Sequence, residues 1–73
     1  MDKKDFQARI GTRIKQIRES KKISQSELAT MCEFEKSNMN RLEAGNTNPT
    51  AYTLYKIAQC LGVSLSEITD VIT

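Results

Sequence analysis

SQSELATMCEFEKSNMNRLEAG, from Ser24 to Gly45, carries the signals for two short helices with very little chain between them. Ser24-Gln-Ser-Glu27 is a capping box, in which the serine hydroxyl accepts from the third helical amide and Glu27 reaches back to the serine amide. It opens a helix with an apolar buried face of Leu28, Ala29 and Cys32. A second helix is predicted over residues 36–44, where Gly45 supplies the left-handed stop.

Only residues 33–35 separate these helices, and the central one, Phe34, is apolar. A turn this short, with one buried residue, forces the two helices to cross steeply rather than to run antiparallel. The sequence therefore predicts a helix-turn-helix motif over about residues 24–44, with the second helix protruding.

The second of these helices has two distinct faces. At about 100° per residue, Met39, Leu42 and Glu43 share the inward side. The outward side presents Ser37, Arg41 and Ala44 between two asparagines, Asn38 and Asn40. Serine and asparagine are mediocre helix formers because their side chains compete for the backbone. Either this is an ordinary solvated surface, or its hydroxyl and amide groups recognise a ligand.

The sequence before the helix-turn-helix motif predicts one long helix. Apolar residues recur every three to four positions, at Phe6, Ile10, Ile14 and Ile17, which indicates a helix over residues 5–21. Gly11 inside it costs about 1 kcal/mol relative to alanine, so we expect close packing at this position. Residues 1–4 are expected to be loose.

Two further helices are predicted after the motif. Thr50 follows a loop containing Pro49 and caps a helix that ends at Gly62. A second capping box, Ser64-Leu-Ser-Glu67, opens a last helix with Leu65, Ile68 and one of Val71 or Ile72 inward. No stretch alternates with period two. The 73 residues therefore predict a compact all-α fold with one core, a single domain over residues 1–73.

Composition excludes several classes of function. The chain has no histidine, no cysteine pair at ligand spacing and no Gly-rich phosphate loop, so we expect no metal, no cofactor and no enzyme. The two cysteines, Cys32 and Cys60, could form one disulfide bond. Both lie on the apolar side of a predicted helix, however, and are interpreted as small buried hydrophobic residues. No signal peptide and no membrane span is recognisable, which predicts a soluble cytoplasmic protein with reduced thiols and no membrane partner.

Charge is unevenly distributed along the chain. The net charge is only +2, yet the first 22 residues hold eight Lys and Arg against three Asp and Glu, whereas the rest holds three against six. This basic first segment is compatible with a position near phosphates and equally with a solvated helix face.

Several motifs occur together in order. SQSELATMCEFEKSNMNRLEAGNTNP, followed by LYKIAQCLGVS, resembles the Cro and phage-repressor helix-turn-helix family, also called the XRE family. Upstream, Ile10-Gly11 and the spacing of Arg13, Ile14, Ile17 and Arg18 also fit, so the resemblance covers about residues 10–70. It implies a five-helix lambda-repressor-like DNA-binding domain. The family usually has glycine where Lys22 and Glu33 stand, and a positive φ there costs a non-glycine residue of order 1 kcal/mol.

The resemblance also implies a site on double-stranded DNA. Residues 36–44 would enter the major groove while the preceding helix crosses the backbone. The implied DNA contacts are Gln25, Lys36, Ser37, Asn38, Asn40, Arg41, Asn46, Thr47 and Asn48. Arginine matches guanine and asparagine matches adenine; Asn38 and residues 46–48 are expected on the backbone. Surface solvation is the alternative for Lys36 and Asn38, and a favourable early helix residue is the alternative for Gln25.

Two structural roles follow from the same resemblance. Glu43 points inward, and its implied partner is Arg18, in a largely buried ion pair. Because one such domain makes few base contacts, useful affinity favours a homodimer on a palindromic operator. The candidate dimer residues, some of which must belong to the core, are Val63, Leu65, Ile68, Val71 and Ile72.

Tyr52 and Tyr55 are expected at the core edge or on the surface.

The predicted function is a sequence-specific DNA-binding transcriptional regulator, most often a repressor in this family. The alternative is a helix-turn-helix module for protein contact, antitoxin-like or coactivator-like, because few positive charges surround residues 36–44. No small-molecule ligand is expected, since no sensor domain follows residue 73; alternatively, the 73 residues belong to a longer protein.

Overall fold

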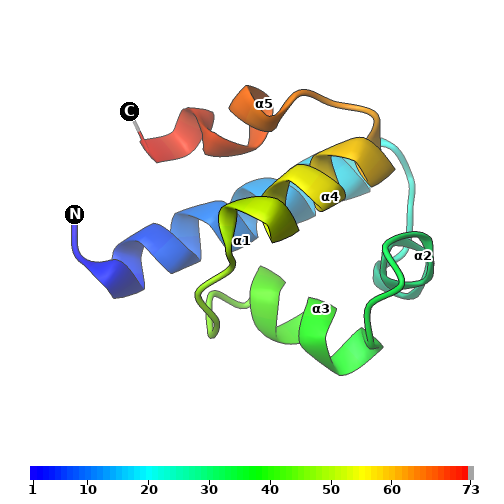
Figure 1. Cartoon of the computed structure of the whole chain (residues 1–73), viewed down its shortest axis with the longest axis horizontal. Coiled ribbons are helices and arrows are strands. Elements are labelled where there is room, and N and C mark those ends of the chain that lie inside the picture. The colour runs from blue at the N-terminus through cyan, green and yellow to red at the C-terminus, as the bar shows by residue number, and fades with distance from the viewer. Residues whose placement is uncertain (73) are drawn as a thin grey trace.

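Helices make up the whole regular structure of the computed structural model, which describes residues 1–72 (Figure 1). They are α1 (Lys3–Ser20), α2 (Gln25–Met31), α3 (Lys36–Glu43), α4 (Ala51–Leu61), α5 (Leu65–Thr69) and a 3-10 turn, η1 (Asp70–Ile72). Residues 1–72 contain no strand, and the all-α prediction is confirmed. Helix α1 packs against α3 on one side and against α5 and η1 on the other (Figure 1).

One apolar core joins all five helices. Its fully buried side chains include Ile10, Ile14, Leu28, Met39, Ile57 and Ile68. Each such side chain contributes about 1.5–3 kcal/mol when removed from water. Ile68, one of the candidate dimer residues, is fully buried in the core and so is not available to a dimer surface, whereas Leu65, expected inward, is 37% exposed. Val63, Val71 and Ile72 are half-buried and pack against the core from outside.

The first helix begins earlier than the sequence predicts. Asp2 is its N-cap, and the Asp5 N–H donates to Asp2 Oδ1 at 2.8 Å. This bond satisfies one of the free amides of the first turn, so Lys3 and Lys4 are helical. The expectation that residues 1–4 are loose is wrong for these two lysines.

The two predicted capping boxes differ. At α2 both halves form, because the Glu27 N–H donates to Ser24 Oγ at 3.0 Å and the Ser24 N–H donates to Glu27 Oε1 at 2.9 Å. At α5 the Glu67 N–H donates to Ser64 Oγ at 3.3 Å, but among the described residues the return bond is missing. At α5, therefore, only one of the two hydrogen bonds of the predicted capping box is formed.

The backbone geometry explains three special positions. A Cβ on Gly11 would lie 2.4 Å from the carbonyl oxygen of Leu42 and 2.7 Å from that of Glu43, so α1 and the last turn of α3 touch through their backbones. The close packing expected at Gly11 is confirmed. Lys22 and Glu33 both have φ of 58°, the left-handed conformation that glycine adopts more readily.

Candidate nucleic-acid interface

The turn between α2 and α3 fixes the direction of the protruding helix. Glu33 takes the left-handed conformation, and the Phe34 N–H then donates to the Ala29 carbonyl at 2.8 Å. The Phe34 ring is half-buried against the core, and Lys56 Nζ lies 5.5 Å from its centroid. These contacts hold α3 across α2 and leave one side of α3 open (Figure 1).

Helix α3 has the two faces that its sequence predicts. Met39, Leu42 and Glu43 are buried. The five residues expected on the other face are all exposed, and so is the neighbouring Lys36; the five are Ser37, Asn38, Asn40, Arg41 and Ala44. An exposed helix face that carries hydroxyl, carboxamide and guanidinium groups offers both donors and acceptors to the edges of DNA bases.

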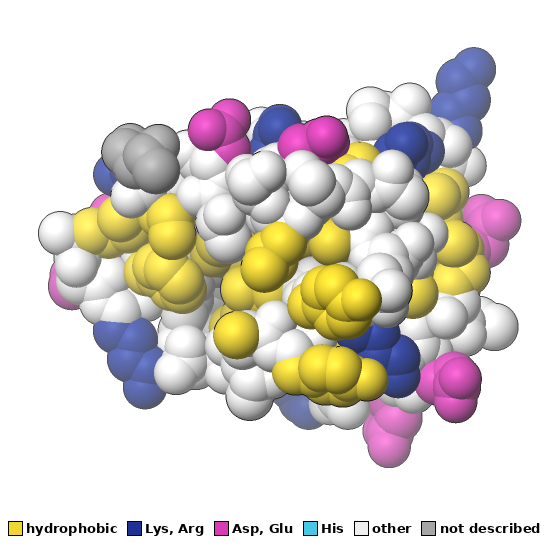
Figure 2. Space-filling view, turned by 45° about the horizontal axis from the view of Figure 1, so that its top comes forward, with side chains coloured by type: hydrophobic (Ala, Val, Ile, Leu, Met, Phe, Trp, Pro, Cys, Tyr) yellow, Lys and Arg dark blue, Asp and Glu magenta, His cyan; other side chains and the backbone are white. Residues whose placement is uncertain are grey.

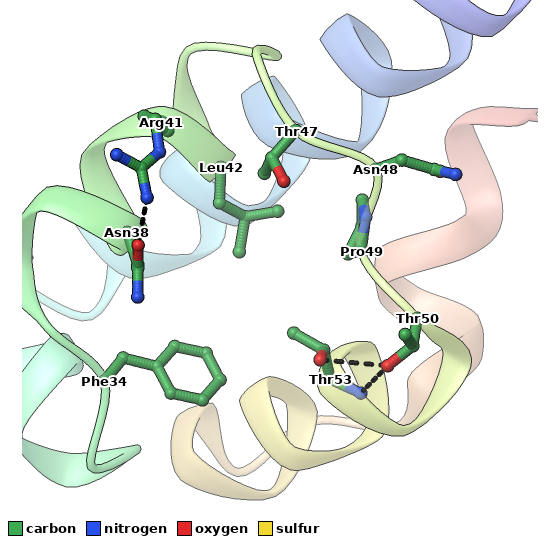
Figure 3. A pocket seen from close by; sticks show the side chains of 9 residues that line it. All are labelled: Phe34, Asn38, Arg41, Leu42, Thr47, Asn48, Pro49, Thr50 and Thr53. Carbon is green, nitrogen blue, oxygen red and sulfur yellow. Dashed lines mark hydrogen bonds between the residues drawn. The ribbon is translucent and has the colours of Figure 1, made fainter.

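Two hollows flank α3, and Arg41 lines both. The α2–α3 hollow, of about 450 Å³, brings together Gln25, Lys36, Ser37, Asn40 and Arg41. The α3–loop hollow, of about 260 Å³, is drawn in Figure 3 and is lined by Phe34, Asn38, Arg41, Leu42, Thr47, Asn48, Pro49, Thr50 and Thr53. Eight of the nine residues that the resemblance implies as DNA contacts therefore line these two adjoining hollows; Asn46 is exposed but lines neither.

Arg41 is held by its neighbour on α3. Its Nη2 donates to Asn38 Oδ1 (Figure 3). Asn38 thereby uses its acceptor within the protein and keeps its N–H groups for an acceptor such as a phosphate oxygen. Arg41 keeps its other donors, already directed by one bond.

The loop before α4 is fixed by Thr50. Its hydroxyl accepts from the Thr53 N–H at 3.1 Å and donates to Thr53 Oγ1 at 3.0 Å (Figure 3). Asn46 and Asn48 are exposed and Thr47 is half-buried. The loop thus presents uncharged hydrogen-bonding side chains beside Arg41.

A buried ion pair ties α1 to α3. Arg18 Nε lies 2.7 Å from Glu43 Oε2, and Arg18 Nη2 lies 3.0 Å from Glu43 Oε1. Arg18 Nη1 also donates to the Ile23 carbonyl at 2.8 Å. The hydrogen bond to Glu43 raises the pKa of Arg18, although burial acts in the opposite direction. The pair has the partners and the position that the family resemblance implies.

The same carboxylate also reaches the exposed face. Gln25 Nε2 donates to Glu43 Oε1 at 3.0 Å, and Asn40 Nδ2 donates to Gln25 Oε1 at 3.4 Å. The resemblance implies a DNA contact for Gln25 but does not connect this residue to Glu43, which is 18 positions away.

The basic first segment divides into two groups. Lys15 is exposed and lines a third hollow with Gln25, Asn40 and Ala44, so it is a cation beside α3 that the sequence did not single out. Arg13 Nε instead donates to the Glu67 carbonyl at 2.8 Å, and Arg9 Nη1 donates to the Val71 carbonyl at 3.3 Å. These two arginines fasten α1 to α5 and η1, away from α3.

The cysteines lie between α2 and α4. Cys32 is fully buried, Cys60 is half-buried, and both are free thiols. Cys60 Sγ donates to the Met31 carbonyl at 3.4 Å. Burial, with a smaller part from a hydrogen bond with Cys60, raises the pKa of Cys32 to about 12. Cys32 thus matches the predicted buried hydrophobe, and Cys60 matches it only in part.

Two absences concern the described residues, 1–72. Within this range no group of three His, Cys, Asp or Glu side chains is placed to hold a metal ion. None of the helices in the same range has the length and hydropathy needed to cross a bilayer.

A short turn, a steep crossing and a protruding polar helix define a helix-turn-helix domain. The sequence matches the model of the helix-turn-helix family HTH_3 over residues 14–68. The chain belongs to this family, the Cro/C1-type or XRE helix-turn-helix regulators, and the resemblance found from its motifs is confirmed. Its relatives place it among DNA-binding transcriptional regulators.

Three curated relatives illustrate the range of the family. The uncharacterized HTH-type transcriptional regulator y4dJ of Sinorhizobium fredii is 36% identical over 64 residues, which cover 88% of this chain and 83% of that protein. The immunity repressor protein of Bacillus phage phi105 is 36% identical over 81% of this chain, and multiprotein-bridging factor 1 of Candida albicans is 39% identical over 77%. The chain spans only 41% and 37% of these last two proteins.

Solved structures share the fold. An HTH_3 family transcriptional regulator from Vibrio cholerae superposes with a TM-score of 0.88 at 29% identity, over 94% of this chain and 39% of that one. The restriction-modification controller protein C.AhdI from Aeromonas hydrophila gives a TM-score of 0.81 at 26% identity, over 84% of this chain and 92% of that one.

Proposed function

We propose that this protein binds a specific double-stranded DNA sequence as a homodimer and represses transcription from a palindromic operator. The observation that carries the proposal is the exposed face of α3, where Lys36, Asn40 and Arg41 stand on a helix that Gly11 and the Arg18–Glu43 pair hold rigidly to α1. A protruding, rigidly supported polar helix is what major-groove recognition requires.

The proposed roles of individual residues are those that the family resemblance implies. Lys36, Ser37, Asn40 and Arg41 face the base edges, with Arg41 matched to guanine O6 and N7. The backbone contacts, which set the register of the protein on the duplex, are Gln25, Asn38, Asn46, Thr47 and Asn48. Lys15 adds a phosphate contact at the hollow that it lines with Gln25, Asn40 and Ala44.

A dimer is favoured by the size of one domain and by its surface. A single module makes too few base contacts for tight specific binding, and two copies would occupy half-sites about one helical turn apart. Apolar side chains gather on the face that α4 and α5 share (Figure 2). Leu65, Tyr52 and Tyr55 are 37%, 70% and 47% exposed, and Val63, Val71 and Ile72 are half-buried. The repressor role is supported by the similarity to a phage immunity repressor.

Selection from a random pool of DNA duplexes, repeated with Arg41→Ala, tests the proposal. We expect the parent protein to enrich a palindrome and Arg41→Ala to lose the preference at one base position in each half-site. Lys4→Ala is the matched control, because it removes the same charge from the exposed first turn of α1 and should leave the selected sequence unchanged. Absence of enrichment at low salt would overturn the proposal.

A second function, protein contact, is favoured by two observations. Multiprotein-bridging factor 1 is among the relatives, and the exposed rings of Tyr52 and Tyr55, with centroids 6.3 Å apart, form an aromatic surface. Salt dependence separates the two functions, because DNA affinity falls with salt in proportion to the number of phosphate contacts. Shallow salt dependence would favour protein contact, and steep salt dependence would favour DNA binding.

A further inference from the structure

A chain of hydrogen bonds leads from the buried ion pair to the exposed face of α3. Glu43 Oε1 accepts from Gln25 Nε2 at 3.0 Å, and Gln25 Oε1 accepts from Asn40 Nδ2 at 3.4 Å. We propose that Glu43 and Gln25 are positioning residues that set the orientation of the Asn40 carboxamide and thereby its base preference. This inference rests on the proposed DNA-binding function.

The direction of each bond follows from the chemistry of Glu43. A carboxylate can only accept, so a carboxamide beside it must present its NH₂ group. Gln25 Nε2 therefore faces Glu43, and Gln25 Oε1 faces the opposite way. That oxygen is also an acceptor, so Asn40 must turn its own NH₂ group toward it. A free carboxamide has two nearly equivalent orientations, and here one of them is removed.

The hydrogen-bond chain starts at a buried residue whose two carboxylate oxygens are both bonded. The side chain of Glu43 is 3% exposed, and both of its oxygens are bonded to Arg18. Arg18 is fixed in turn by the Ile23 carbonyl. Gln25 is half-buried and Asn40 is exposed, so the hydrogen-bond chain runs from the core to the surface. A hollow of about 310 Å³ next to these residues leaves room for the edge of a ligand.

The orientation has a consequence for recognition. Asn40 uses one N–H on Gln25 and keeps its Oδ1 acceptor together with the second N–H. Adenine offers the complementary pair in the major groove, a donor at N6 and an acceptor at N7, whereas guanine offers two acceptors. A fixed Asn40 should therefore favour adenine, and an Asn40 free to turn should discriminate less.

The test measures base preference at each position of the selected operator for the parent and for Gln25→Met, Asn40→Ala and the double variant. Asn40→Ala identifies the position that Asn40 contacts. We expect Gln25→Met, which keeps the length of the side chain but removes the amide, to weaken the preference at that same position by about tenfold. In the double variant the preference should equal that of Asn40→Ala alone, since Gln25 acts through Asn40.

Glu43→Gln extends the test to the core. A carboxamide at position 43 can donate as well as accept, so it no longer requires Gln25 to present its NH₂ group. If this variant folds by circular dichroism, the preference at the Asn40 position should weaken although residue 43 touches no DNA. If it does not fold, the base preference of Gln25→Met alone tests the inference. A uniform loss of affinity in Gln25→Met, with unchanged preference, would overturn the inference and leave the proposed function standing. A parent protein without any preference would overturn both.

Discussion

Arg18 of α1 and Glu43 of α3 form a two-point ion pair in which the side chains are 10% and 3% exposed. Removing one member would leave the other charge buried without compensation, at a cost of about 3–5 kcal/mol. This is comparable with the whole stability of a small domain. The pair also fixes the end of α3 to the longest helix of the fold.

Glu43→Ala is therefore expected to unfold the protein or to lower its free energy of unfolding by about 3–5 kcal/mol. Urea denaturation followed by circular dichroism measures the change. The matched control is the double variant Arg18→Leu Glu43→Leu, which removes both charges and should recover part of the loss. Full retention of stability in Glu43→Ala would contradict the structural role of the pair.

Lys22→Gly and Glu33→Gly should each stabilise the protein. Both residues have φ of 58°, where a side chain costs about 1 kcal/mol and glycine does not. Each substitution should raise the melting temperature by about 4–8 °C. Lys21→Gly is the control, because the adjacent lysine has φ of −96° and its replacement should give no gain. A lower melting temperature in Glu33→Gly would show that the side chain contributes more than its backbone strain costs.

Lys15→Ala should weaken DNA binding without changing its sequence preference. If Lys15 contacts a phosphate, the slope of log K against log salt should become shallower by about 0.9. Titrations at several salt concentrations measure this slope for the parent, Lys15→Ala and the control Lys4→Ala, whose slope should stay unchanged. An unaltered slope in Lys15→Ala would place Lys15 off the DNA backbone.

The Cys32 thiol should be unreactive in the folded protein. The thiolate is the reactive form, so burial and the pKa of about 12 should leave Cys32 unreactive toward a disulfide reagent near pH 8. The variant Cys60→Ser isolates Cys32, and its thiol should react fully in urea. Rapid reaction of native Cys60→Ser would contradict the burial of Cys32.

The features predicted correctly from sequence are those that depend on local spacing. The inward side of α3 follows from the periodicity of Met39 and Leu42, and the end of α4 follows from Gly62, whose φ is 72°. Gly11 was interpreted correctly because a glycine inside a helix pattern has few other reasons to be there.

The features missed depend on contacts between distant parts of the chain or on a choice between two local bonds. The position of Lys15 beside α3 depends on how α1 crosses it, and the Gln25–Glu43 bond joins residues on different helices. Asp2 could cap a helix or remain in solvent, and its bond to the Asp5 N–H decides this. Periodicity also could not show which of Leu65 and Ile68 is buried, because both suit an apolar helix face. Only the packing of the helices decides that Ile68 is the buried one.

Helix α1 has neighbours on two opposite sides. Gly11 and Arg18 join it to α3, while Arg9 and Arg13 join it to the last turns of the chain. In a dimer formed through α5, helix α1 would lie between the dimer surface and α3 in each protomer. The operator spacing would then depend on how α1 packs between α3 and α5 rather than on the side chains of α3 that face the bases.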